Sequence, residues 1–422
     1  MSQTASIALQ QPVVLKKYQQ TLFLICFLSS LFSGTVSTLM SVYLPYAMKD
    51  LLSGTDASHT DMISAGINAV FIFGWTAGGI IWGVFCDTLG RKKSFIYATL
   101  CYGIFTILTG LSTSWFLVLA CRFLSGFGIG GVLVVTTMLV FETYKDKKRE
   151  VLLGILSISI PVGIFSAGLL RFFVSDWRWA FVIGTIPVIL SGLAAVFFTE
   201  SEKWIKAKKN ESAAVNNIRT LFSSHNRKNL VMGSLVFGAA LVGLWATFSW
   251  LPFWIQGMVR DGSGQKQNGT AMMFMGGGGL LGGFISGWVV HALGLKKTLL
   301  LCFGASFILA FFLFKLTHTL SVSTFLQIGF LAIFFGMSQG ALSIYIPELF
   351  PTSLSATATG VCFNLGRIIT GVAVFFIGSL VEMLGGYGNA IFYFDFVFVI
   401  GFFITVFYKH SKYVNPDGLH NS

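Results

Sequence analysis

Twelve long apolar stretches, separated by short polar breaks, constrain this chain more than any other feature of its sequence. A hydrocarbon core about 30 Å thick needs about 20 helical residues, and a helix satisfies its own backbone hydrogen bonds within lipid. The sequence therefore predicts an all-α membrane protein with twelve transmembrane helices. The predicted spans are residues 21–46, 61–86, 93–111, 114–141, 151–173, 178–198, 230–258, 267–291, 298–314, 322–349, 354–381 and 389–408.

The composition fits lipid and excludes two other classes of chain. Of the 422 residues, 55% are apolar and 10% are charged, whereas about a quarter of a soluble globular domain is charged. A disordered chain is excluded because low hydrophobicity is what prevents collapse. The six cysteines fall inside apolar runs without a Cys-x-x-Cys pair, and no Gly-x-x-x-x-Gly-Lys-Ser/Thr loop occurs. We therefore expect no metal site and no cofactor.

The basic residues are distributed as they are in the loops of membrane proteins. The net charge is +12, and placing both termini in the cytoplasm puts 20 of the 28 Lys and Arg on the cytoplasmic side and five outside. This is the positive-inside bias. We therefore expect a multi-pass protein of a bacterial inner membrane with both termini in the cytoplasm. A nucleic-acid partner is not expected, because no basic stripe interleaved with aromatic residues occurs.

The longest polar stretch divides the chain into two parts of similar size. Residues 200–229 follow the sixth span and carry Lys, Asn, Ser and Glu without a long apolar period. We interpret this stretch as a cytoplasmic linker between an N-terminal six-helix half, residues 1–199, and a C-terminal six-helix half, residues 230–422.

The two halves repeat one sequence pattern. An offset of 204 residues leaves nine of the twenty positions from Gly74 to Lys93 identical. The spans that follow align at an offset of 206. This offset pairs Glu142 with Glu348 and Gly154 with Gly360, so the same interval of twelve residues separates the two matches in each half. The halves are therefore predicted to be pseudo-symmetric copies of one unit.

The turn between the second and third spans carries a recognisable motif. It reads Gly83-Val-Phe-Cys-Asp87-Thr-Leu-Gly90-Arg91-Lys92-Lys93 and resembles the G-x-x-x-D-x-x-G-R-[KR] loop of the major facilitator superfamily. The resemblance covers essentially the whole chain and implies the major facilitator fold of two six-helix halves. Further stretches that resemble the family are Arg122-Phe-Leu-Ser-Gly126-Phe-Gly128-Ile-Gly130, Asp176-Trp-Arg-Trp, Glu200-Ser-Glu-Lys-Trp204, Pro347-Glu348-Leu-Phe-Pro351-Thr and Asn364-Leu-Gly-Arg367.

Two of these stretches resemble particular branches of the family. The stretch from Glu200 to Trp204 is similar to the P-E-S-P-R-W signature of sugar porters and metabolite:proton symporters. The stretch around Arg367 resembles aromatic-acid and sialate symporters. Those symporters carry D-G-x-D in the first span, where this chain has Ser33-Gly34-Thr35-Val36 and lacks both acids.

The resemblance also implies a cytoplasmic gate at the inner helix ends. Asp87 can face the positive N-terminus of a neighbouring helix, and the glycines beside it would let that neighbour come close. In the family, arginines and glutamates pair in an inner charged cluster that forms and breaks as the halves rock. The alternative is that these charges only mark orientation. The predicted gate residues are Gly83, Asp87, Gly90, Arg91, Glu142, Arg149 and Glu348.

Two arginines inside spans indicate a ligand. At the positions of Arg122 and Arg367 an ionised side chain costs about 2.5–3.5 kcal/mol unless it faces water, a counter-ion or a substrate. Asn364 precedes Arg367 by one helical turn and shares its face. Because a guanidinium binds a carboxylate through two hydrogen bonds, an anionic substrate is the simplest ligand. Alternatively, each arginine pairs internally and holds helices together. Arg171, near the outer end of its span, can reach the interface.

Further candidates contribute polar tips or titratable groups. Large residues with polar tips that either line the cavity or pack between helices are Trp245, Trp250, Tyr43 and Gln339. Candidates for proton coupling are Asp395, which lies well inside span twelve, and Glu142 and Glu348 at the inner ends of their spans. Against Asp395, the family architecture places span twelve away from the central cavity.

Together these features predict a secondary active transporter that moves a small organic anion, a carboxylate, by alternating access, with proton coupling left open. Alternatives are a sugar or neutral-metabolite transporter, a drug exporter, or a membrane receptor or lipid-handling protein without solute flux. An enzyme is not expected, because no nucleophile, base and orienting group recur at usable spacing. The expected partners are the small-molecule substrate and the bilayer, and we expect a monomer.

Overall fold

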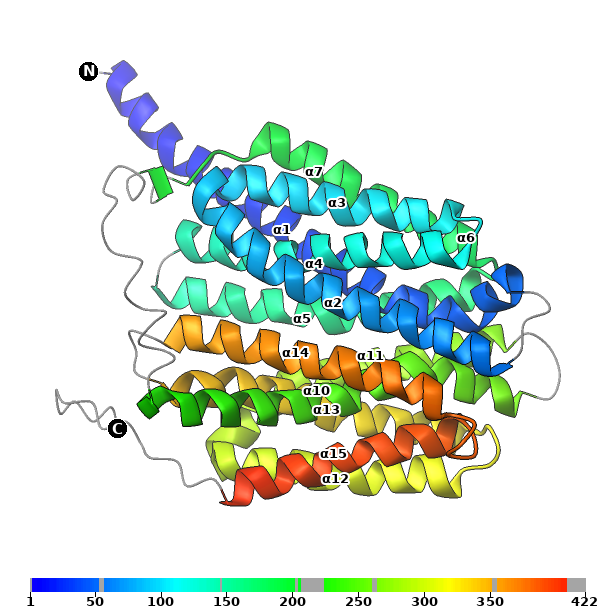
Figure 1. Ribbon diagram of the computed structural model, residues 1–422. Coiled ribbons are helices and arrows are strands. Elements are labelled where there is room, and N and C mark those ends of the chain that lie inside the picture. Colours follow the sequence, from blue (N-terminus) through cyan, green and yellow to red (C-terminus); the bar gives the residue numbers. More distant parts are fainter. Residues whose placement is uncertain are drawn as a thin grey trace. The chain divides into compact units, whose positions relative to one another are not determined.

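The computed structural model describes residues 2–52, 57–144, 146–201, 204–205, 224–259, 264–350 and 355–407, and their regular structure is helical (Figure 1). Twelve helices in this part of the chain are long and apolar enough to cross a membrane, which confirms the predicted fold class. The elements are α1 (Ser2–Leu51), α2 (Ala57–Leu89), α3 (Arg91–Leu111), α4 (Trp115–Thr143), α5 (Asp146–Phe173), α6 (Trp177–Ala180), η1 (Phe181–Gly184), α7 (Thr185–Phe197), α10 (Ser224–Met258), α11 (Gln265–Leu293), α12 (Leu295–Leu316), α13 (Val322–Glu348), α14 (Ser355–Leu380) and α15 (Tyr387–Phe407).

The sixth span is built from three consecutive segments rather than one helix. A short helix, α6, is followed by the 3-10 turn η1 and then by α7. Pro187 is the third residue of α7 and has no N–H to donate to the turn before it. Tightening of the chain into a 3-10 turn at this point follows from the missing donor.

The helices pack as two compact units that do not follow the predicted halves. Unit 1 comprises Met1–Ser37, Phe73–Gly163 and Arg178–Glu211, and unit 2 comprises Thr38–Ile72, Ile164–Trp177 and Ser212–Ser422. One end of α1, α2 and α5 therefore packs with helices of the C-terminal half, inside unit 2. The boundaries 1–199, 200–229 and 230–422 describe the repeat in the sequence, whereas the contacts divide the chain differently.

Equivalent glycine seams join a helix pair in each unit. A Cβ atom added to any of these glycines would collide with a carbonyl group of the facing helix, so the backbones touch directly. Residue numbers in α2 and α11 differ by 204, and those in α4 and α13 by 206, the two offsets found in the sequence repeat. The repeat therefore extends to individual contacts. The pairs are Gly74–Phe123, Gly78–Phe127 and Gly130–Trp75 in unit 1, and Gly278–Gly329, Gly282–Ile333 and Gly336–Gly279 in unit 2.

Large apolar side chains are exposed along the helices while polar ones are buried. Val196 is 77% exposed and Phe173 is 73% exposed, yet Ser29 and Thr99 have no exposed surface. Several of the buried hydroxyls are hydrogen-bonded, as where Tyr102 donates to the carbonyl of Ser29 over 3.0 Å. An exposed apolar surface of this extent is suited to lipid rather than to water. The chain is therefore an integral multi-pass membrane protein.

Candidate functional site

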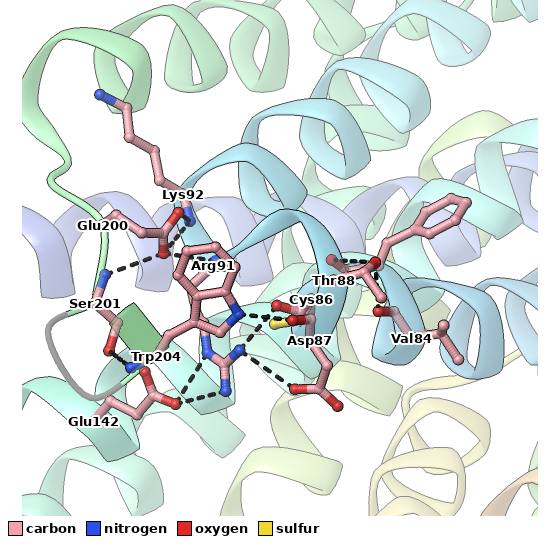
Figure 2. A network of polar contacts seen from close by, with 11 residues as sticks. Val84, Cys86, Asp87, Thr88, Arg91, Lys92, Glu142, Glu200, Ser201 and Trp204 are labelled. Carbon is pink, nitrogen blue, oxygen red and sulfur yellow. Dashed lines mark hydrogen bonds and ion pairs between the residues drawn. The ribbon is translucent and has the colours of Figure 1, made fainter. Parts of the chain in front are cut away.

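A network of polar contacts surrounds Arg91, the first residue of α3, in unit 1 (Figure 2). Its Nη2 and Nε atoms lie 2.9 and 3.0 Å from Oε1 of Glu142 at the end of α4. Its Nη1 atom donates to the carbonyl of Cys86 over 2.9 Å and lies 3.3 Å from Oδ1 of Asp87. The side chains of Arg91 and Glu142 are both 91% buried, whereas that of Asp87 is 74% exposed. The predicted pairing of Arg91 with Glu142 is thus present in the structure.

Residues that follow the sixth span complete this network. The carboxylate of Glu200 accepts hydrogen bonds from the backbone N–H groups of Arg91, at 2.7 Å, and Lys92, at 3.3 Å (Figure 2). These are free N–H groups at the N-terminus of α3, where the helix dipole favours a negative charge. The indole of Trp204 donates to the carbonyl of Asp87 over 2.7 Å, at the end of α2. Glu200 and Trp204 therefore join the segment after α7 to the α2–α3 turn. We call Asp87, Arg91, Glu142, Glu200 and Trp204 the Arg91 network.

Gly90 makes room for this arrangement. Its φ of 98° lies where only glycine is comfortable, and a Cβ atom there would overlap the carboxylate of Glu200. The equivalent Gly294 has a φ of 82°, but no described atom lies within 4 Å of a Cβ built on it. Gly83 likewise has no described atom within 4 Å of such a Cβ, so the close helix approach expected there is absent from this structure.

Two other predicted gate residues, Glu348 and Arg149, are not part of the Arg91 network. Glu348 ends α13 and is exposed, in unit 2. The side chain of Arg149 lies outside the described residues. Oε2 of Glu142 is buried and has no hydrogen-bond partner among the described residues, so this carboxylate retains acceptor capacity beyond Arg91.

Arg122 and Arg367 lie in different units and in different surroundings. Arg122 is 1% exposed in unit 1 and donates to the carbonyl of Val36 over 3.3 Å, which ties α4 to α1. Arg367 is half-buried on α14 in unit 2 and donates to Oδ1 of Asn364 over 3.2 Å. The predicted proximity of Arg367 and Asn364 is therefore confirmed. Gln339 on α13, which contacts α14, has a buried Nε2 atom without a hydrogen-bond partner among the described residues.

The predicted large residues of the cavity are mostly buried in unit 2. The ring of Trp245 lies 6.4 Å from that of Phe71, centroid to centroid. Trp250 stacks on Tyr387 at 5.8 Å and is fully buried. Tyr43, also fully buried, donates its hydroxyl to the carbonyl of Val174 over 2.8 Å. These contacts are ordinary helix packing.

Three charged residues inside the spans are buried in surroundings that the sequence does not predict. Asp395 is completely buried, and neither carboxyl oxygen has a hydrogen-bond partner among the described residues. Asp61, which is not among the candidate residues predicted from the sequence, is 92% buried and accepts a 2.7 Å hydrogen bond from Tyr387. Arg171 is 99% buried, so the expectation that it reaches the interface is wrong. It is held inside because its guanidinium donates to the carbonyl of Ser175 over 2.8 Å and lies over tyrosine rings.

Comparison with known proteins places these features in a family context. Residues 26–374 match the profile of the Major Facilitator Superfamily. The chain is 28% identical over 306 residues to a putative niacin/nicotinamide transporter of Bacillus subtilis, covering 72% of this chain and 75% of the relative. It is 26% identical over 369 residues to the cis,cis-muconate transport protein of Acinetobacter baylyi (85% and 86% covered) and 27% identical over 316 residues to a sialic acid transporter of Escherichia coli (74% and 76%).

Solved structures share the fold. The crystal structure of a D-xylose-proton symporter matches with a TM-score of 0.78 at 16% identity, covering 94% of this chain and 99% of that one. An inward open structure of a xylose transporter from E. coli matches with a TM-score of 0.77 at 15% identity, covering 94% and 98%. At this level of identity the likeness concerns the fold alone.

Proposed function

The chain belongs to the Major Facilitator Superfamily, and from this premise we propose that it moves a small organic anion, a carboxylate, across the membrane by alternating access. The match over residues 26–374 confirms the resemblance carried by the motif from Gly83 to Lys93. The family and the relatives are transporters, not enzymes. The class of substrate is the part that the proposal adds.

The observation that carries the proposal is the half-buried guanidinium of Arg367 beside Asn364. A cation at this depth costs free energy unless it is used, and its planar donors match a carboxylate. The neutral amide of Asn364 fixes the orientation of the guanidinium without neutralising its charge. Gln339 lies on the adjacent α13, and its buried amide donor has no hydrogen-bond partner in the described part of the chain, which supports a polar site of the same kind.

The names of the relatives support an acid as substrate. Muconate and sialic acid carry carboxyl groups, and so does niacin. Nicotinamide, which the name of the B. subtilis relative also includes, is the neutral amide of niacin. A neutral metabolite is therefore the second candidate, and a niacin–nicotinamide pair discriminates between the two.

For gating and coupling we propose roles that follow the predicted orientation. The basic turns, including the Arg91 network, would face the cytoplasm, and the predicted gate residues would open and close there. Among the three coupling candidates, Glu142 is engaged by Arg91, Glu348 is exposed and Asp395 is buried without a described hydrogen-bond partner. We propose Asp395 as the carboxyl to test first for proton coupling.

A thermal-shift assay on the purified protein in detergent tests the substrate class. A ligand that binds only the folded state stabilises it, by about 2.7 kcal/mol at 100 times its Kd, which raises the Tm by several degrees. We expect niacin and muconate to raise the Tm, and nicotinamide, xylose and tetraphenylphosphonium to leave it unchanged. Stabilisation by xylose or the cation alone would contradict the carboxylate proposal, and stabilisation by nicotinamide alone would favour the neutral metabolite.

Replacing Asp87 by Asn is expected to slow uptake about tenfold while changing the Kd of the substrate less than about twofold. The exposed carboxylate lies at the end of α2, 3.3 Å from Arg91, and its charge acts in the gate rather than on the substrate. Uptake and binding measured on the same preparation check this. Asp50→Asn serves as the control, because the amide still accepts the 3.1 Å hydrogen bond from Trp177. Equal losses of uptake and binding would point to a folding defect instead.

A further inference from the structure

Arg171 is a buried cation, and its contacts among the described residues are with the N-terminal half. Its guanidinium carbon lies 3.9 Å from the ring centroid of Tyr46 and 4.9 Å from that of Tyr43, both on α1. Its Nη1 atom donates to the carbonyls of Val174 and Ser175, just after α5. Aromatic faces and carbonyl oxygens compensate the charge without any acidic partner in these contacts.

The hydroxyl of Tyr46 connects this cation to the C-terminal half of the chain. It donates to Oε1 of Gln256 on α10 and accepts from Nδ2 of Asn268 on α11 over 2.9 Å. One hydroxyl thus uses its donor and an acceptor lone pair on two helices of the other half. All of these residues belong to unit 2.

Direct backbone contact between α5 and α11 lies next to this cluster. A Cβ atom on Gly168 would lie 2.6 Å from the backbone nitrogen of Met273, and one on Gly269 would lie 2.7 Å from that of Phe172. Gln265, at the start of α11, also donates to the carbonyl of Phe172 over 3.2 Å. Packing this close is either formed or broken, because interfaces of this kind do not deform gradually.

We propose that Arg171, Tyr46, Gln256 and Asn268 form a latch that holds one end of the transport path closed and releases when α1 and α5 separate from α10 and α11. The division of contacts supports this. The charge and its compensating groups stay together on α1 and α5, and the Arg171 cluster is joined to α10 and α11 by hydrogen bonds between the Tyr46 hydroxyl and two amides. Opening therefore exposes groups that water solvates readily and leaves the buried cation paired. The inference rests on the proposed transport cycle, but not on the identity of the substrate.

Tyr46→Phe removes both hydrogen bonds of the Tyr46 hydroxyl to the C-terminal half and keeps the ring under Arg171. The reporter is Ser64→Cys, at a fully buried position of α2 in unit 2, in a background whose six native cysteines are replaced by serine. The rate of labelling by a membrane-impermeant maleimide is measured on the purified protein in detergent. Loss of two hydrogen bonds is expected to raise the rate about 5- to 30-fold, since the open population increases.

Tyr102→Phe is the matched control, because it removes a buried hydroxyl that bonds Ser29 within unit 1. Its labelling rate should equal that of the parent. Gln256→Ala should increase the rate in the same direction as Tyr46→Phe, and the double variant should add little to Tyr46→Phe alone. Gel filtration identifies any variant that does not fold, and Asn268→Ser then replaces it. Unchanged labelling in the folded variants would overturn the latch. Failure of carboxylates to bind would overturn only the proposed substrate.

Discussion

Arg367→Gln is expected to lower the affinity for the carboxylate substrate at least about 30-fold and to abolish uptake at low substrate concentration. Truncating one partner of a buried, hydrogen-bonded charge pair costs about 2–5 kcal/mol, and 1.4 kcal/mol is a factor of ten in Kd. Glutamine keeps a polar tip beside Asn364, so the 3.2 Å contact between these side chains can be replaced by an amide pair. Thermal shifts with niacin and muconate, read against the wild type, measure the loss.

Two further variants distinguish three possible causes of the loss: the charge of Arg367, the geometry of its guanidinium, and the removal of any cation beside an asparagine. Arg367→Lys keeps the charge but loses the two-pronged match to a carboxylate, so we expect an intermediate affinity. Lys315→Gln removes a different cation that also bonds an asparagine, since Lys315 donates to Asn389 over 2.7 Å at the end of α12. Substrate affinity should not change in this control. Wild-type affinity in Arg367→Gln would show that Arg367 is structural and that the anion is bound elsewhere.

The spans and the repeat could be predicted because both depend on local pattern. Hydropathy over about 20 residues locates a helix in lipid without any knowledge of its neighbours. The glycine spacing was readable as well, and the two sequence offsets recur in the contacts, as when Gly74 meets Phe123 and Gly278 meets Gly329. The pairing of Arg91 with Glu142 came from the family motif rather than from spacing alone.

The contacts that could not be predicted join residues that are far apart in the chain. Tyr46 and Gln256 are 210 residues apart, and Glu200 and Arg91 are 109 apart. No periodicity in the sequence specifies such pairs. Arg171 was expected at the interface because its position near the end of a span permits it, but the tyrosines one and two turns before the end of α1 provide a buried alternative. The same limit explains why the contacts do not divide the chain at the linker.

Gly90→Ala, directly beside the Arg91 network, is expected to be strongly destabilising for the addition of a single methyl group. Alanine at a φ of 98° and a ψ of 164° is in a region that is essentially reserved for glycine, at a cost of about 1–3 kcal/mol. The methyl group would also displace the Glu200 carboxylate from the N-terminus of α3. A helix N-terminus deprived of a charged cap loses about 0.5–2 kcal/mol more. The Tm in detergent should fall by several degrees, and uptake should fall with it.

Two other glycines of the repeat allow these contributions to be separated. Gly294→Ala imposes the same backbone strain at a φ of 82°, but no described atom lies within 4 Å of the added methyl. Gly83→Ala imposes neither, because Gly83 lies inside α2 with no described atom within 4 Å of its Cβ position. The order of Tm loss should therefore be Gly90→Ala, then Gly294→Ala, with Gly83→Ala unchanged or slightly stabilised by its better helix propensity.

The comparison of Gly90→Ala with Gly294→Ala isolates what Glu200 contributes. Glu200→Gln keeps an acceptor oxygen but loses the charge, so on its own it should cost less than the difference between the two alanine variants. Combined with Gly90→Ala it should add almost nothing, because the methyl group has already displaced this side chain. Equal Tm losses for Gly90→Ala and Gly294→Ala would mean that backbone strain accounts for the whole effect. The segment after α7 would then contribute no stability to the α2–α3 turn, and its hydrogen bonds to Arg91 and Lys92 would merely replace bonds to water.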